Sequence, residues 1–240
     1  KGTKVGVFGG SFSGMGDFIV TPEEMKENFD VEFIVSDNDE ARLITQSVTD
    51  EEIDAEVAAD KEIFDFPIDI EDEVYRMNTR ACLSIRKWIE KEKLDAFSVN
   101  FLKACPAYGI DSMPFIEACK AMTRGIGYAG EGDALDAVFC GALIRAFGDA
   151  SFVEIFCPDW KGNTLLLSHM GEYNPNLTSG KCGMKEIPFI YGDAKNPVVS
   201  YGRYKGGDAV FINLYRTKDD FRMIISAVDM VEVRLDDDTL

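Results

Sequence analysis

The order of strand-like and helix-like segments constrains this chain more than any other feature. Up to about residue 147, short apolar segments such as Lys4–Phe8, Val31–Val35 and Ala96–Phe101 alternate with stretches of helical periodicity. The longest of these stretches runs from Ile70 to Trp88, where apolar positions step by three or four. Strands that alternate with helices build a parallel sheet covered by helices. We therefore predict a Rossmann-like α/β domain over residues 1–147.

Helix-starting signals support this order. Thr21-Pro22-Glu23-Glu24 places an N-cap, a proline at the first helical position and a capping glutamate in sequence. Asp37-x-x-Glu40 and Thr49-x-x-Glu52 repeat the capping-box pattern. Two further helices are predicted, one capped by Ser112 and running toward Arg124, and one from about Glu131 to Phe147.

The character of the chain changes after Gly148. The later apolar segments are short, β-rich and separated by glycine or charged turns: Ser151–Phe156, Thr164–His169, Ala209–Tyr215 and Phe221–Val228. Lys161-Gly162-Asn163 is typical of a hairpin turn between the first two. We predict a second, mostly antiparallel and barrel-like β domain over residues 148–240, and we expect it to be incomplete.

Charge excludes several classes of partner. The 240 residues carry a formal charge of −18, so the chain has no basic surface for a nucleic-acid backbone or an anionic membrane. No apolar run reaches the ~18 residues that a membrane span needs.

The cysteines favour a reducing compartment. The six stand at 82, 105, 119, 140, 157 and 182, without any C-x-x-C spacing and mostly in apolar stretches. We interpret them as reduced, buried side chains of a cytoplasmic protein. The chain starts at Lys1 rather than at a methionine, and a strand follows three residues later. We therefore expect it to be part of a longer polypeptide.

Two familiar site types fit the sequence poorly. The glycine-rich turn Gly9–Gly16 follows a strand, but it lacks G-x-G-x-x-G spacing and the next helix starts only at Pro22. This favours a plain loop at the carboxyl end of a strand, where α/β sheets bind small ligands. A serine hydrolase is disfavoured because there is no G-x-S-x-G elbow and the single histidine, His169, directly follows Ser168.

A more specific group consists of acidic residues and that histidine. Glu131 and Asp133 stand at a strand-to-helix junction among small residues, Glu154 lies within the apolar segment 152–156, and His169 ends the next one. Alternation gives Glu154 the same face as Phe152 and Phe156, so we expect it inside. Two glutamates and an imidazole suit a divalent cation such as Mn²⁺. Alternatively, the acids complement a helix dipole, Glu154 faces solvent and His169 is a strand-end residue.

Three blocks of the sequence resemble the motifs of one enzyme family. Gly127-Tyr128-Ala129-Gly130-Glu131-Gly132-Asp133 is similar to the G-x-x-A-G-E-G-D-W segment of L-arabinose isomerases, and Ser151-Phe152-Val153-Glu154 is similar to their S-F-M-E strand. Lys161-Gly162-Asn163, followed by Ser168-His169-Met170-Gly171-Glu172 and Pro175, resembles K-G-N-D…S-H-M-L-E-x-x-P. Order and spacing agree across the three blocks. The resemblance places the chain in the arabinose/fucose isomerase superfamily, as a central domain plus part of a C-terminal domain.

The resemblance implies a metal-dependent aldose–ketose isomerase that acts on a pentose or deoxyhexose such as L-arabinose through a metal-held ene-diol. By resemblance, Glu131, Glu154 and His169 hold the divalent metal, usually Mn²⁺, and Glu131 and Glu154 also transfer protons. Phe101 matches an aromatic near the sugar, although a core phenylalanine explains it equally well. Glu172 is a candidate second-sphere partner of His169. The resemblance also implies a homo-oligomer with the site near a subunit interface.

Departures from the family pattern leave an alternative open. Ala134 replaces a tryptophan, Ile155–Pro158 replace family residues after S-F-M-E-D, and the family's fourth ligand, a later histidine, has no counterpart. We therefore expect this chain alone to be inactive. The alternative is a non-catalytic sugar-binding or regulatory α/β module on the same scaffold.

Overall fold

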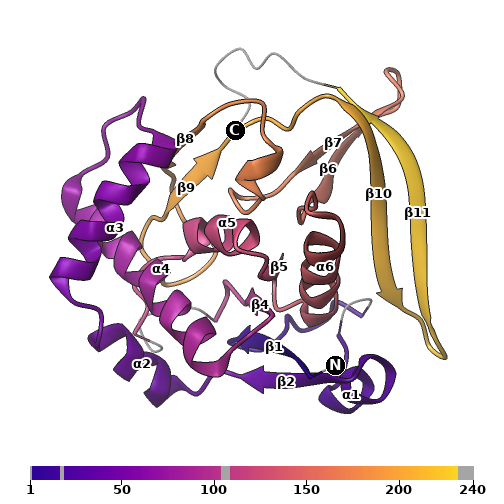
Figure 1. Cartoon of the computed structure of the whole chain (residues 1–240), viewed down its shortest axis with the longest axis horizontal. Helices are drawn as coiled ribbons and strands as arrows, with labels where there is room; N and C mark the ends of the chain where they lie inside the picture. The colour runs from indigo at the N-terminus through magenta and orange to yellow at the C-terminus, as the bar shows by residue number, and fades with distance from the viewer. Residues whose placement is uncertain (1, 17–18, 104–108, 232–240) are drawn as a thin grey trace.

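The computed structural model describes residues 2–16, 19–103 and 109–231, and it is built around one parallel sheet (Figure 1). The sheet has the order β2-β1-β4-β5, with every neighbouring pair parallel. Its strands are β1 (Thr3–Phe8), β2 (Val31–Val35), β4 (Ala96–Val99) and β5 (Gly127–Gly130). The helices around it are α1 (Pro22–Phe29), α2 (Asn38–Gln46), α3 (Asp50–Ile63), α4 (Asp72–Glu92), α5 (Phe115–Thr123) and α6 (Ala134–Phe147). The predicted helix-covered parallel sheet is thus confirmed.

Helices cover both faces of this sheet. Phe8, Phe97 and Tyr128 point to one face, where they share a core with Trp88 of α4 and with α5. Side chains of the opposite parity, such as Val7, pack against α1 and α6 on the other face. This alternation follows from the two-residue period of a strand. The loops that follow the strands lie at the carboxyl edge of the sheet, which the helices on the two faces do not occupy.

Most of the predicted helix starts are confirmed. Thr21 and Thr49 each form a capping box, and Asp37 accepts from the backbone N–H groups of Asp39 and Glu40. The predicted cap at Ser112 is wrong: α5 starts after Pro114, and the Ser112 hydroxyl instead accepts from the Asn78 side chain at 3.0 Å.

The second half consists of small sheets. β6 (Glu154–Asp159) and β7 (Thr164–Ser168) form one antiparallel pair, and β10 (Gly207–Arg216) and β11 (Phe221–Met230) form another. The sequence did not predict β3 (Phe64–Asp65), β8 (Cys182–Glu186), β9 (Val198–Tyr201) or the 3-10 turn Pro175–Leu177. Because β8 pairs with β3, this third sheet joins segments from both sides of residue 148. A barrel is not shown by these sheets and stays a prediction, as does the domain boundary.

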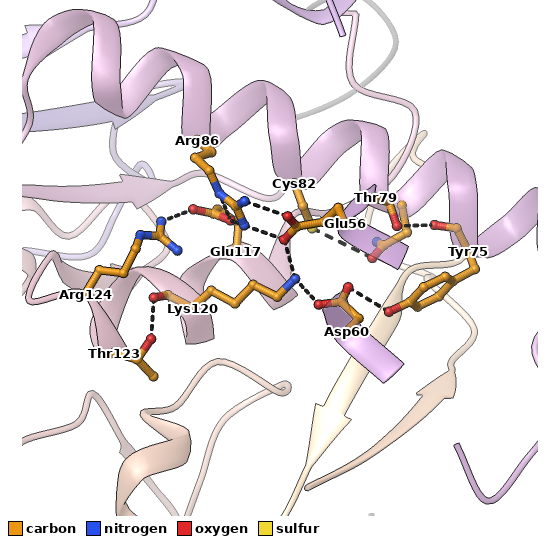
Figure 2. A network of polar contacts seen from close by, with 11 residues as sticks. Glu56, Asp60, Tyr75, Thr79, Cys82, Arg86, Glu117, Lys120, Thr123 and Arg124 are labelled. Carbon is orange, nitrogen blue, oxygen red and sulfur yellow. Dashed lines mark hydrogen bonds and ion pairs between the residues drawn. The ribbon is translucent and has the colours of Figure 1, made fainter. Parts of the chain in front are cut away.

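A buried ion network ties α3, α4 and α5 together (Figure 2). Arg86 of α4 bridges Glu56 of α3 at 2.6 Å and the fully buried Glu117 of α5 at 2.7 Å. Lys120 pairs with Glu56 at 2.5 Å and also with Asp60. Charges buried in this way are tolerated only when paired, so the network fixes how these three helices pack.

Five cysteines lie in the described ranges, and all five are free thiols. Four are buried as predicted, but Cys157, on the exposed strand β6, is itself exposed; Cys105 lies outside the described residues. Within the same ranges, no helix has the length and apolar character of a membrane span.

Candidate active site

The carboxyl edge of the parallel sheet gathers the segments that carry the predicted site. The glycine-rich loop follows β1, Phe101 follows β4, and Glu131 follows β5. The loop touches the β5 end directly, since Phe12 donates its backbone N–H to the Glu131 carbonyl at 3.0 Å. The carboxyl ends of parallel strands are where α/β sheets bind small ligands.

Glu131 occupies a tight turn, not the first turn of a helix. The Asp133 N–H donates to the Gly130 carbonyl at 2.9 Å, and the two residues between them have φ angles of 62° and 82°. Two consecutive positive φ angles are typical of a type I′ turn, where glycine, asparagine and aspartate predominate. Holding a glutamate there costs about 1–2 kcal/mol. The predicted helix start at Glu131 is wrong; α6 begins at Ala134, with Asp133 as its N-cap.

His169 is held in a fixed orientation by buried groups. It directly follows β7, and its Nδ1 lies against Oε2 of Glu172, whose other oxygen accepts from the Tyr128 hydroxyl. Both Glu172 and Tyr128 are buried. Phe152 packs edge-on against the imidazole ring, with centroids 5.0 Å apart. The other ring nitrogen, Nε2, is therefore directed away from Glu172.

Glu154 lies beside that nitrogen. Its Oε1 is 3.8 Å from Nε2 of His169, although 15 residues separate them in sequence. The expectation that Glu154 is enclosed is wrong, because 45% of its side chain is exposed. Alternation does not apply across this segment: β6 begins only at Glu154, Phe152 precedes it and packs on the core, and Phe156 is exposed.

The ionisable groups influence one another. Burial raises the pKa of Glu131 above its usual value of 4.5, and the negative charge of Glu154 raises it further. Burial alone would lower the pKa of His169, but the charge of Glu172 and its hydrogen bond outweigh that effect, and the pKa rises above 6.5. Glu154 and Glu131 act in the same direction on His169. This mutual dependence is expected where carboxylates and an imidazole share one site.

Aromatic rings pack together beside the loops at the carboxyl edge of the sheet. The half-buried Phe101 stacks edge-on against Phe12 with centroids 4.8 Å apart, and against Tyr191 at 5.6 Å. Phe189 lies behind them, 6.4 Å from Phe101. Phe101 therefore belongs neither to the sheet core alone nor to open solvent, and its ring packs against Phe12 of the loop that contacts the Glu131 turn.

The donor groups, carboxylates and an imidazole, are ligands that suit a divalent cation such as Mn²⁺. The fit rests on His169: Nδ1 is buried against Glu172, so Nε2 faces Glu154 in the arrangement known for metal-binding histidines. Gly130 leaves room for this ring, since a Cβ there would stand 3.2 Å from Nε2. Among the described residues, however, no three Asp, Glu, His or Cys side chains are gathered closely enough to count as a metal cluster.

Comparison with known proteins identifies the family. A model of the L-arabinose isomerase central domain matches residues 23–147, more than half of the chain, and a model of the L-arabinose isomerase C-terminal domain matches residues 149–240. The chain belongs to the L-arabinose isomerase family.

Individual relatives agree with this assignment. The L-arabinose isomerase of Oceanobacillus iheyensis is 27% identical over 197 residues, which cover 78% of this chain and 40% of the relative. L-arabinose isomerase 2 of Bacillus licheniformis is 26% identical over 197 residues, which also cover 78% of this chain and 40% of the relative. The enzyme of Levilactobacillus brevis is 29% identical over 158 residues, covering 64% of this chain and 33% of the relative. This member of the L-arabinose isomerase family thus spans about 40% of the length of the first two relatives.

Sequence reasoning missed three side chains around the site. Phe12 lies in the glycine-rich loop, which we interpreted from its sequence only as a general ligand-binding loop. An aromatic residue within such a loop is the sequence signal that could have indicated a contact with the ligand. Tyr191 follows no motif, and Tyr128 looked like part of a glycine-rich run. Only the fold shows that Tyr128 reaches Glu172.

Proposed function

We propose that the protein is a metal-dependent aldose–ketose isomerase acting on a pentose or deoxyhexose such as L-arabinose. The observation that carries this proposal is the position of His169, with Nδ1 held by Glu172 and Nε2 3.8 Å from Glu154, against the glycine that precedes Glu131. The names of the relatives supply the substrate class.

Glu131, Glu154 and His169 would hold a divalent cation, Mn²⁺ or a similar ion. Such an ion polarises sugar oxygens and stabilises the negative charge of an ene-diol route. Glu131 and Glu154 also serve as base and acid: one takes the proton from C2 of the aldose and returns it to C1, and the other carries a proton from the C2 oxygen to the C1 oxygen. The raised pKa of Glu131 suits this role, because an efficient proton carrier has a pKa near the working pH.

Phe101 and Phe12 are proposed as a wall against the apolar face of the sugar. Their rings stack at 4.8 Å, and Phe12 is bound through its backbone to the carbonyl of Glu131. An apolar wall beside a few polar groups is the usual composition of a small-molecule site.

We also propose a cytoplasmic homo-oligomer whose active site lies near a subunit interface. Free thiols support the compartment. Exposed apolar side chains on the β6–β7 pair support association: Phe156 is 72% exposed and Trp160, at its turn, 86%. Light scattering after gel filtration measures the oligomeric state.

The decisive test compares Glu131→Gln and Glu154→Gln with Glu90→Gln, which changes an exposed glutamate of α4. Each variant is made in the full-length protein that contains this chain, and calorimetric titration with Mn²⁺ and ketose formation from L-arabinose and from deoxyhexoses are measured on it. We expect both site variants to lose Mn²⁺ affinity and at least about 10²-fold in turnover, and Glu90→Gln to match the wild type. Sugar binding without Mn²⁺ dependence or turnover would instead support the non-catalytic module.

A further inference from the structure

The backbone of the turn that carries Glu131 is hydrogen-bonded to two other segments, strand β4 and the loop after β1. Glu131 and Gly132 both have positive φ angles, which is unusual for a glutamate. An unfavourable backbone conformation persists only where surrounding groups stabilise it, so a neighbouring group must stabilise this turn.

Ser98 of β4 is that group. It is completely buried, and its hydroxyl accepts from the Gly132 N–H at 2.9 Å. The same hydroxyl donates to the Ala129 carbonyl at 2.6 Å, with the Gly130 carbonyl at 3.0 Å. One side chain thus bonds to the backbone on both sides of Glu131.

The glycine-rich loop holds the turn from the opposite side. Ser11 donates its hydroxyl to the Gly132 carbonyl at 2.7 Å, next to the bond from the Phe12 N–H to the Glu131 carbonyl. The contact is close: a Cβ on Gly132 would stand 2.4 Å from the Gly10 carbonyl oxygen. The glycine-rich loop, whose sequence does not fit a nucleotide site, therefore contacts the turn that carries Glu131.

We propose that Ser98 is a positioning residue that fixes the Glu131 carboxylate for metal binding and proton transfer, with Ser11 in a supporting role. This inference rests on the proposed function of Glu131. It follows from hydrogen-bond balance: without the hydroxyl, the buried Gly132 N–H loses its acceptor and the turn loses the bond that favours its left-handed conformation. Catalytic groups displaced by about 1 Å can lose about 10² in rate.

The test uses Ser98→Ala, Ser98→Thr and Ser11→Ala in the full-length protein that contains this chain, with Ser112→Ala as the matched control. Ser112 is equally buried, and its hydroxyl also accepts a hydrogen bond, but from Asn78. Circular dichroism confirms folding, Mn²⁺ titration gives the dissociation constant, and steady-state kinetics separates kcat from KM. Amide exchange at Gly132 reports the bond itself.

We expect Ser98→Ala to weaken Mn²⁺ binding about 10- to 100-fold, the range for outer-sphere partners, and to lower kcat more than it raises KM. Ser98→Thr, which keeps the hydroxyl, restores most of both, Ser11→Ala loses a few-fold, and Ser112→Ala retains wild-type values. If Ser98→Ala does not fold, the few-fold loss in Ser11→Ala decides, because Ser11 lies in a partly exposed loop.

Different failures have different meanings. Wild-type Mn²⁺ affinity and kcat in Ser98→Ala or, if it does not fold, in Ser11→Ala, while Glu131→Gln loses both, would overturn the positioning role and leave the proposed function intact. Losses of equal size in Ser112→Ala would also overturn it, because the effect would then be general destabilisation. A wild-type protein that binds no Mn²⁺ would remove the proposed function, and this inference with it.

Discussion

Glu131→Gly should separate the stability of this protein from its function. The wild-type side chain stands at φ 62°, and a residue with a Cβ in the left-handed region costs about 1–2 kcal/mol. Glycine removes that cost but gives the unfolded chain extra freedom, which takes back about 0.4–1 kcal/mol. The net gain is about 1 kcal/mol, or about 2–4 °C in Tm for a chain of this size.

Charge adds to the gain in the same direction. Because burial and Glu154 raise the folded-state pKa of Glu131, its ionised form is less favourable in the folded than in the unfolded protein. Stability linked to this group is fully present below the unfolded pKa and is lost as pH rises through the folded value. The advantage of an uncharged residue therefore exists at pH 7 and disappears below about pH 4.5.

Thermal unfolding with EDTA and with Mn²⁺ provides the assay. In EDTA, we expect the order Glu131→Gly above Glu131→Gln above wild type, where the glutamine variant keeps the strained backbone and removes only the charge. In Mn²⁺ at about 100 times its Kd, the wild type gains about 2.7 kcal/mol and moves above Glu131→Gly, which gains little.

Two results would refute this reasoning. A Glu131→Gly variant that melts below Glu131→Gln in EDTA would show that the left-handed backbone stores no relievable strain. A Mn²⁺-induced shift as large in Glu131→Gly as in the wild type would show that the carboxylate is not a ligand.

Three further predictions concern the buried charges. Lys120→Met leaves Glu56 and Asp60 without their shared ammonium and should cost about 3–5 kcal/mol in urea unfolding, whereas Lys91→Met, in an exposed pair with Glu40, should change stability by less than about 1 kcal/mol. Burial would raise the pKa of Glu56, but Arg86 and Lys120 lower it to about 2, so its contribution of about 3 kcal/mol is present above pH 4.5 and is lost as pH falls toward 2; the destabilisation by Glu56→Gln should shrink accordingly between pH 7 and pH 3. Glu172→Gln should weaken Mn²⁺ binding about 10- to 100-fold in calorimetric titration while the protein stays folded.

Local signals explain what the sequence could predict of the fold. Each of the capping boxes at Thr21 and Thr49 is contained within four consecutive residues, so it does not depend on the rest of the chain. The helical periodicity of α4 is a local signal too, because it repeats along the helix itself. β3 and β8 were missed because their pairing joins residues more than a hundred positions apart, and the two residues of β3 are too short to show a period.

For the candidate site, the sequence predicted that Glu154 lies near His169 but not that the Glu154 side chain is exposed. Resemblance placed Glu131, Glu154 and His169 together, and the structure puts His169 next to Glu154. The exposure of Glu154 depends on what covers the β6–β7 pair, which no pattern within residues 152–156 contains. Ser98 was not predictable either, because its role comes from the register that sets it opposite Ala129.

The two glycines around Glu131 show how a short motif can record contacts with distant segments. Gly130 has no side chain because the His169 ring occupies that space, 3.0 Å from where a Cβ would stand. Gly132 has none because the backbone of the glycine-rich loop after β1 fills the space instead. Each glycine thus admits a different partner: one admits the imidazole beside the carboxylate, and the other admits the loop that binds the turn. The glutamate lies between them on a backbone that is unfavourable by itself, and it is held there only because both neighbours leave room for the groups that fix it.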